Sequence, residues 1–145
     1  MSAGSDRVMN MVNTLQTWQG IERQSMSDTA EIMEKTKNPL IRMVMEIIRH
    51  DSLMHHRVQQ FLIDTLTEQN VTVSREDVAQ TWEQIEKHDE TEKKVVGIAK
   101  QLRDEAWNPV HKQLLTYLVT DEEKHDSLLE ALNEIKIGMS KASGG

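Results

Sequence analysis

The chain has 145 residues, 24 acidic and 17 basic side chains, a net charge of −7 at pH 7 and no cysteine. Its length suits one domain with a single core. The acidic balance repels phosphate backbones and argues against a nucleic-acid partner. The lack of thiols excludes disulfides, thiolate zinc sites and iron–sulfur clusters, so a metal ion would have to be held by carboxylates and imidazoles.

The sequence also argues against a membrane protein. No apolar run approaches the roughly 20 residues that a membrane-spanning helix needs. The N-terminal stretch has neither the basic start nor the apolar middle of a signal peptide. We therefore expect a cytoplasmic protein with no membrane segment.

The first two predicted helices are divided by Pro39. The first begins at Ser5 or Asp6, both suitable N-caps, and runs to about residue 37. Pro39 ends it, because a proline disfavours helix in the residue before it and fits the first turn of a new helix. The second helix then runs to about Glu68, and both segments are rich in good helix formers.

The second half of the chain is predicted to form two further helices. Residues 69–73 show no helical period and form a connector, after which Ser74 and the acidic residues that follow it are an N-terminal capping signature. This third helix stops before Pro109, and the fourth runs from there to about residue 137, followed by a disordered polar tail, 139–145. The connector reaches at most ~20 Å and the helices are ~45 Å long, so the predicted topology is up-down-up-down.

The two halves of the chain repeat each other at a spacing of 70 residues. The identical pairs are Asn38-Pro39 and Asn108-Pro109, Glu22 and Glu92, Asp51 and Asp121, His55 and His125, and Leu62 and Leu132. Each copy, residues 5–67 and 74–137, is predicted to be a helical hairpin that buries its apolar face on another unit. The predicted fold is an all-α antiparallel four-helix bundle over residues 1–138, made of these two repeated hairpins.

Acids and histidines occupy positions that are predicted to face the core. Residues three and four apart share one face of a helix, and a carboxylate on the buried face costs several kcal/mol unless it is paired or binds a cation. The chain distances from Asn38 and Asn108 place these side chains in one layer near the middle of the bundle. The residues concerned are Glu22, Asp51, His55, Glu92, Asp121 and His125.

This pattern resembles the ferritin-like di-iron carboxylate proteins, in which a glutamate on one helix and Glu-x-x-His on the next occur twice. The stretch from Asp121 to His125 is similar to the fourth-helix motif of bacterioferritins and rubrerythrins. The resemblance covers residues 5–137 and implies a site for iron, or for manganese or zinc. It also implies that Asp51 and Asp121 accept hydrogen bonds from the ligand histidines. The implied metal ligands are Glu22, His55, Glu92, Glu122 and His125.

The first hairpin departs from the family motif at Ser52, where a glutamate is expected. Three carboxylates and two histidines remain, which weakens a two-metal site. His88, one turn before Glu92, is a candidate replacement ligand, although it matches Trp18 in the repeat and packing is the alternative. The charged residues around it, Asp89 among them, are interpreted as a solvated helix face.

The function implied by the resemblance is that of a small ferritin-like metal-binding protein. With two metals bound, it would react with dioxygen or peroxide as an oxidoreductase. The alternative for the same residues is a buried polar network without metal. The alternative function is a non-catalytic helical bundle that forms a homodimer through Trp82, Trp107 and methionines. The sequence leaves these alternatives open.

Overall fold

The computed structural model describes residues 3–68, 71 and 73–144, with side chains to residue 138. Every regular element in these residues is an α-helix. Good helix formers fill all four helices, and both prolines fall in the first turn of a helix, where a missing N–H breaks no hydrogen bond. The helices are α1 (Ala3–Lys35), α2 (Pro39–Thr67), α3 (Arg75–Glu105) and α4 (Pro109–Gly144).

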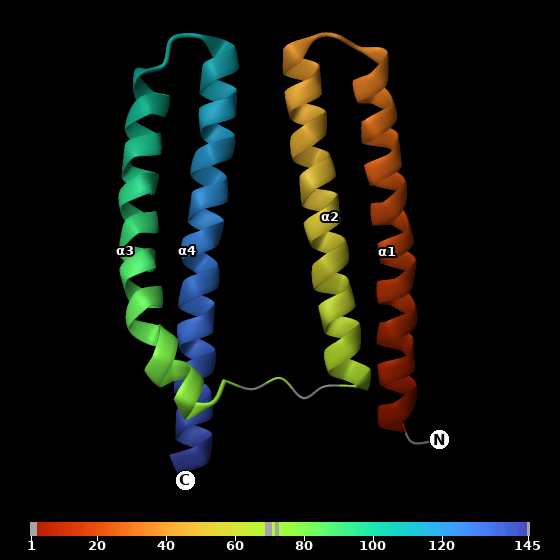
Figure 1. Ribbon diagram of the computed structural model, residues 1–145, viewed down its shortest axis with the longest axis vertical. Coiled ribbons are helices and arrows are strands. Elements are labelled where there is room, and N and C mark those ends of the chain that lie inside the picture. Colours follow the sequence, from red (N-terminus) through yellow and green to blue (C-terminus); the bar gives the residue numbers. More distant parts are fainter. Residues whose placement is uncertain (1–2, 69–70, 72, 145) are drawn as a thin grey trace. The chain divides into compact units, whose positions relative to one another are not determined.

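The chain divides into two compact units, Met1–Val71 and Thr72–Gly145. In the first, α1 packs on α2, and in the second, α3 packs on α4, each pair forming an antiparallel hairpin joined by a short turn (Figure 1). These observations confirm the all-α fold class and the two hairpins of the predicted four-helix bundle. The prediction that both hairpins belong to one domain stays a prediction.

The same asparagine cap begins the second helix of each hairpin. Asn38 and Asn108 each accept, through Oδ1, the backbone N–H groups two and three residues later, at 2.9 to 3.5 Å. Two N–H groups that would otherwise lack partners at the helix start are satisfied in this way. At the start of α3, Ser74 and Asp77 form the predicted capping box.

The ends of the helices agree with the sequence except at the start of α1, which begins at Ala3 so that Ser5 and Asp6 lie within the helix, and at the end of α4. This helix continues past Gly138, near which the sequence predicted its end, and reaches Gly144. Gly138 does not adopt a positive φ, so its backbone does not interrupt the helix. Within the predicted connector, residues 69, 70 and 72 lie outside the described residues, as does residue 145 of the predicted tail.

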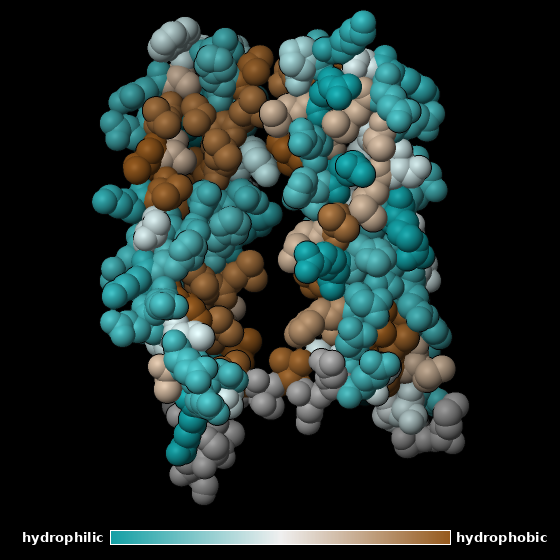
Figure 2. Space-filling model, in the orientation of Figure 1, coloured by the Kyte–Doolittle hydropathy of each residue, from teal (hydrophilic) through white to brown (hydrophobic). Residues whose placement is uncertain are grey.

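The N-terminal hairpin buries mainly polar side chains between its helices, whereas the described residues of the C-terminal hairpin that are buried are Ala99, Val119 and Glu92. Many large apolar side chains are exposed on their hairpin, Ile48 and Leu118 among them. In Figure 2 the hydrophobic side chains visible over α3 and α4 form two patches with a hydrophilic band between them. None of the helices in the described part of the chain combines the length and the hydropathy that crossing a membrane requires. The buried polar residues are Gln19, Glu22, Thr29, Ser52, Gln59 and Glu92.

Candidate metal centre

Two acids and a histidine meet in the middle of the C-terminal hairpin. Glu122 and His125 are three residues apart and therefore share the face of α4 that packs on α3, where Glu92 lies. The Nδ1 atom of His125 is 3.5 Å from Glu92 Oε2 and 3.5 Å from Glu122 Oε2. One donor atom from each of the three residues lies within 4.8 Å of the other two. The hairpin thus brings together three of the five predicted ligands.

Glu92 is the most buried member of this cluster. Its side chain is 11 % exposed, and its Oε2 atom receives no hydrogen bond from the described residues. The other oxygen, Oε1, lies 2.8 Å from His88 Nε2. A buried carboxylate oxygen without a donor or a counter-charge destabilises the fold. A proton or a cation is therefore needed beside Oε2.

The protonation of the two glutamates is coupled. The pKa of Glu92 lies below its ordinary value, mainly because a hydrogen bond from Glu122, which forms when Glu122 carries a proton, favours the charged form of Glu92. The same hydrogen bond raises the pKa of Glu122, and burial raises it further. Of the two carboxyls, Glu122 is therefore the one that takes up a proton first as the pH falls. In the absence of a cation, one shared proton relieves the repulsion between the two acids.

A second acid pair lies one turn away on the same interface. Asp89 and Asp126 each have a buried Oδ1 atom that receives no hydrogen bond from the described residues. A hydrogen bond between them, which forms when Asp126 carries a proton, is the main cause of the lowered pKa of Asp89 and of the raised pKa of Asp126. Lys93 Nζ, 3.3 Å from Asp89 Oδ2, compensates part of this charge.

Asp89 corrects one interpretation of the sequence, because it is half-buried and not part of a solvated face. The spacing of the residues in the sequence already indicated that Asp89 lies on the buried face. Asp89 precedes Glu92 by three residues and Asp126 follows Glu122 by four, so each lies on the same helix face as the glutamate beside it. The second pair could therefore have been predicted with the first.

The donor set suits a transition-metal ion. Carboxylate oxygen and imidazole nitrogen bind zinc, iron and manganese, with bonds of about 2.1 Å to zinc. Two donors on one such ion are then at most about 4.2 Å apart, so the present separation of up to 4.8 Å requires only small side-chain shifts to close. Three protein ligands leave coordination positions for water or a substrate. The Oε2 atom of Glu92, which receives no hydrogen bond from the described residues, is suited to be one of these three protein ligands.

The corresponding place in the N-terminal hairpin holds the other two predicted ligands. Glu22 Oε1 lies 3.3 Å from His55 Nδ1, so these residues also meet within one hairpin. Ser52, which stands where Glu122 stands in the repeat, is 5 % exposed and lies 2.9 Å from the hydroxyl of Ser25. This hairpin thus pairs its histidine with one carboxylate and replaces the second with a neutral hydroxyl contact.

The two predicted supporting aspartates differ in their surroundings. Asp121 Oδ2 lies 3.6 Å from His125 Nε2, and Asp121 Oδ1 lies 3.1 Å from Lys124 Nζ. Asp51 is half-buried and forms no ion pair or side-chain hydrogen bond with the residues that the structure describes. A distance of 3.6 Å is too long for a hydrogen bond. The predicted bonds from these aspartates to the ligand histidines therefore stay predictions.

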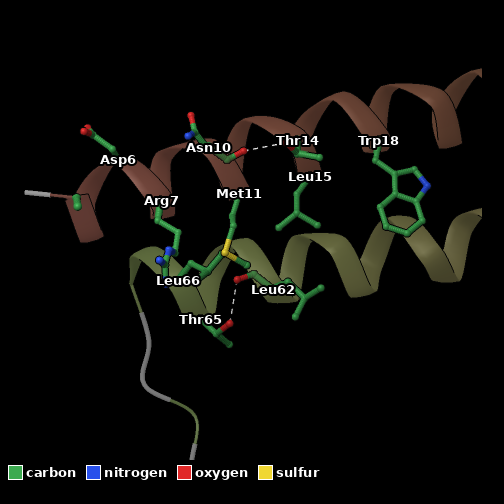
Figure 3. Close-up of a pocket in the computed structure, with 11 residues that line it drawn as sticks. Asp6, Arg7, Asn10, Met11, Thr14, Leu15, Trp18, Leu62, Thr65 and Leu66 are labelled. Carbon is green, nitrogen blue, oxygen red and sulfur yellow. Dashed lines mark hydrogen bonds between the residues drawn. The ribbon is translucent and has the colours of Figure 1, made fainter.

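An apolar groove of about 730 Å³ lies at the open end of the N-terminal hairpin (Figure 3). Met11 and Leu15 of α1 point toward Leu62 of α2, and Arg7 lies among these residues. Trp18, four residues before Glu22, also lines it. The groove contains no residue of the predicted ligand set.

Comparisons of the chain with protein-family models, with curated proteins and with solved structures find no match. The resemblance to ferritin-like proteins therefore stays a prediction from the sequence. The chemistry that the site can perform has to be inferred from its own donor atoms.

Proposed function

We propose that the protein binds a divalent transition-metal ion, either iron, manganese or zinc, through Glu92, Glu122 and His125. The observation that carries the proposal is the buried Oε2 atom of Glu92, which receives no hydrogen bond from the described residues and faces an acid and an imidazole from α4. A cation there would neutralise the glutamates and satisfy this oxygen. All three donors come from one hairpin, so the site needs no other part of the chain.

The geometry favours a metal ion over a permanent polar network. A shared proton needs only the two glutamates, yet His125 also directs Nδ1 at both of them from 3.5 Å. Nδ1 is thus no closer to one glutamate than to the other, and three donor atoms that lie within 4.8 Å of one another are typical of a metal site. The further ligands Glu22 and His55, expected from the ferritin-like resemblance, stay predictions.

A ferritin-like oxidoreductase is the finer form of this proposal. Bound iron or manganese would supply electron transfer to dioxygen or peroxide. The chain's own residues would hold the ion, balance its charge and leave a position open for the oxidant. Because the sequence contains no cysteine, no second thiolate-bound iron centre can supply the electrons, and an external donor is required.

Metal analysis of a matched pair of variants tests the proposal. Glu122→Gln removes one proposed ligand, whereas Glu123→Gln removes the same charge from the adjacent exposed residue, which contacts Lys100 at 3.4 Å. Full-length protein is stripped with a chelator and then titrated anaerobically with Fe²⁺, Mn²⁺ or Zn²⁺ in a calorimeter. Bound metal is counted by mass spectrometry. We expect wild type and Glu123→Gln to bind an ion and Glu122→Gln to lose most of the affinity.

Two results would overturn the proposal. One is wild-type protein that binds none of the three ions. The other is equal binding by wild type and Glu122→Gln, which would show that the ion lies elsewhere. Circular dichroism of both variants separates a loss of ligand from a loss of fold, because the variants should be as helical as wild type.

Homodimerisation as a non-catalytic helical module is the second candidate function. Trp107, in the turn between α3 and α4, is 92 % exposed and favours it, since a second copy of the chain would bury this large apolar side chain. Trp82 does not contribute in the same way, because it is half-buried, donates to Glu86 and lies beneath Lys136. Sedimentation equilibrium of wild type and Trp107→Ser tests this candidate. A dimer in wild type that dissociates in the variant supports it, and a wild-type monomer removes it.

A further inference from the structure

The carboxylate of Glu92 is contacted by a histidine on each side. His88 Nε2 lies 2.8 Å from Oε1, and His125 Nδ1 lies 3.5 Å from Oε2. Only His125 belongs to the group of three donors that surround the candidate ion position. The side chain of His88 is 62 % exposed, so its ring lies at the edge of the cluster. The two histidines therefore have different relations to the site.

The contact with His88 determines which way the Glu92 carboxylate faces. The terminal torsion of a glutamate is broad, so an unrestrained carboxylate turns easily. His88 precedes Glu92 by four residues on α3 and therefore lies directly beside it on the helix surface. With Oε1 held at 2.8 Å by this ring, Oε2 is directed at Glu122 and His125.

The N-terminal hairpin shows the same glutamate without this contact. Trp18 occupies the position of His88 in the repeat, and its side chain is largely exposed. There, Glu22 directs Oε1 at the ring of His55, 3.3 Å away. Glu22 thus forms a hydrogen bond with the histidine of the second helix, whereas Oε2 of Glu92 lies 3.5 Å from His125 and receives no hydrogen bond from the described residues.

We propose that His88 is a positioning residue of the metal site, which holds Oε1 of Glu92 so that Oε2 is presented to the ion. The inference rests on the proposed metal binding and adds a residue to it. A histidine that contacts a metal-binding carboxylate from outside restricts its orientation and strengthens binding. His88 itself does not contact the ion.

The chain offers its own model for a conservative replacement. Gln101 donates through Nε2 to Glu105 Oε1 at 3.2 Å, four residues later on the same helix. Glutamine can therefore make the contact that His88 makes with Glu92. His88→Gln keeps a donor at this position, and His88→Leu removes it. His111→Leu, at an exposed histidine of α4, is the matched control.

The test is a titration of full-length protein with Co²⁺, followed by visible absorption, and competition with Zn²⁺. We expect His88→Leu to lower the affinity about 10- to 100-fold, His88→Gln to recover most of it, and His111→Leu to bind as wild type does. The absorption spectrum per bound Co²⁺ should be the same in wild type and His88→Gln, because His88 is not a ligand.

Each failure has a distinct meaning. No Co²⁺ or Zn²⁺ binding by wild type would overturn the proposed function itself. Normal binding by both wild type and His88→Leu would overturn only the role of His88. A His88→Gln spectrum that differs from wild type would make His88 a ligand and would also overturn the inference. If His88→Leu does not fold, His88→Ala makes the same comparison, with solvent in place of the exposed ring.

Discussion

The two hairpins share the same helix–turn–helix backbone, but they place different side chains at the corresponding positions of the repeat. In the N-terminal hairpin neutral groups meet, with the Ser25 and Ser52 hydroxyls 2.9 Å apart and the Gln19 amide donating to α2. In the C-terminal hairpin the repeat puts Asp89 in place of Gln19 and Glu122 in place of Ser52. Neutral side chains supply both donors and acceptors, whereas facing carboxylates supply acceptors only.

This difference shows what the fold requires and what it does not. The α1/α2 hairpin folds with a polar interface that carries a single buried acid, so the acid pairs of the α3/α4 hairpin are not needed to make a hairpin. They instead create a need for protons or a cation. The acidic interface is therefore the one to which we assign a ligand.

The largest effect is expected when the N-terminal hairpin is given the missing acid. Ser52→Glu places a carboxylate beside Glu22 and His55, as Glu122 is placed beside Glu92 and His125. In the absence of metal this buried charge should lower the free energy of unfolding by about 3 kcal/mol. Saturating Zn²⁺ or Fe²⁺ should restore stability, because the ion binds only the folded state. Thermal unfolding with and without the ion measures both effects.

Ser52→Gln is the matched control, since it loses the same hydroxyl contact and adds nearly the same volume without a charge. It should show no metal-dependent gain beyond that of wild type. Metal counting should give one more ion per chain in Ser52→Glu than in wild type. If the count does not increase, the repeat does not carry the geometry of the site from one hairpin to the other.

The next largest effect concerns pH. A metal ion must displace the proton of Glu122, whose pKa is raised by Glu92 and by burial above its ordinary value of 4.5. Below this raised pKa the metal affinity should fall at least about tenfold per pH unit, because one proton leaves as the ion binds. Competition with a chelator at a series of pH values gives the slope. A constant affinity across this range would show that Glu122 is not a ligand.

A smaller effect is expected at the second acid pair. The raised pKa of Asp126 means that its contribution to stability is present at acid pH and is lost as the pH rises through that value. Asp89, with a lowered pKa, contributes in the opposite direction, and its contribution is lost only as the pH falls through its lowered value. At a pH above both pKa values the two carboxylates are charged and repel each other.

Asp126→Asn should remove this repulsion, because the amide donates to Asp89 at every pH. We expect the melting temperature of the metal-free protein to rise by a few degrees at pH 7 and the gain to shrink toward acid pH. Asp104→Asn, at an exposed acid of α3, is the control and should change neither the melting temperature at pH 7 nor its dependence on pH. A melting temperature that falls at pH 7 would mean that the two acids do not face each other in solution.

The smallest effect is expected from removal of the asparagine caps, and it should be equal in the two hairpins. Asn38→Ala and Asn108→Ala each remove a side chain that caps the second helix of a hairpin. Each should lower the free energy of unfolding by about 1 kcal/mol. Denaturant unfolding measures the two values. Effects that differ severalfold would show that the repeat is less regular in energy than in backbone structure.

Local signals made the helices predictable from the sequence. Pro39 and Pro109, the asparagines before them, and Ser74 act through neighbouring backbone groups, so their effects do not depend on distant contacts. The 70-residue repeat then identified the two hairpins. The end of α4 was not predictable in this way, because Gly138 weakens a helix without having to end it.

The candidate site was predictable only in part. Spacing of three and four residues identified Glu92 and His125, and the resemblance to ferritin-like proteins added Glu122. The hairpin brings these three residues together. The facing of Asp89 and Asp126 and the contact between His88 and Glu92 were missed. They depend on which of several charged faces of α3 turns toward α4, and a run of charged residues looks alike on every face.

Anomalous X-ray scattering from crystals of metal-loaded protein tests the central claim most directly. Data collected at the iron and zinc absorption edges locate the ion and identify the element together. We predict a peak between α3 and α4, within bonding distance of Glu92, Glu122 and His125. A metal-loaded crystal with no peak at these three residues, or with its peak only beside Glu22 and His55, would contradict the assignment of the site to the acidic hairpin.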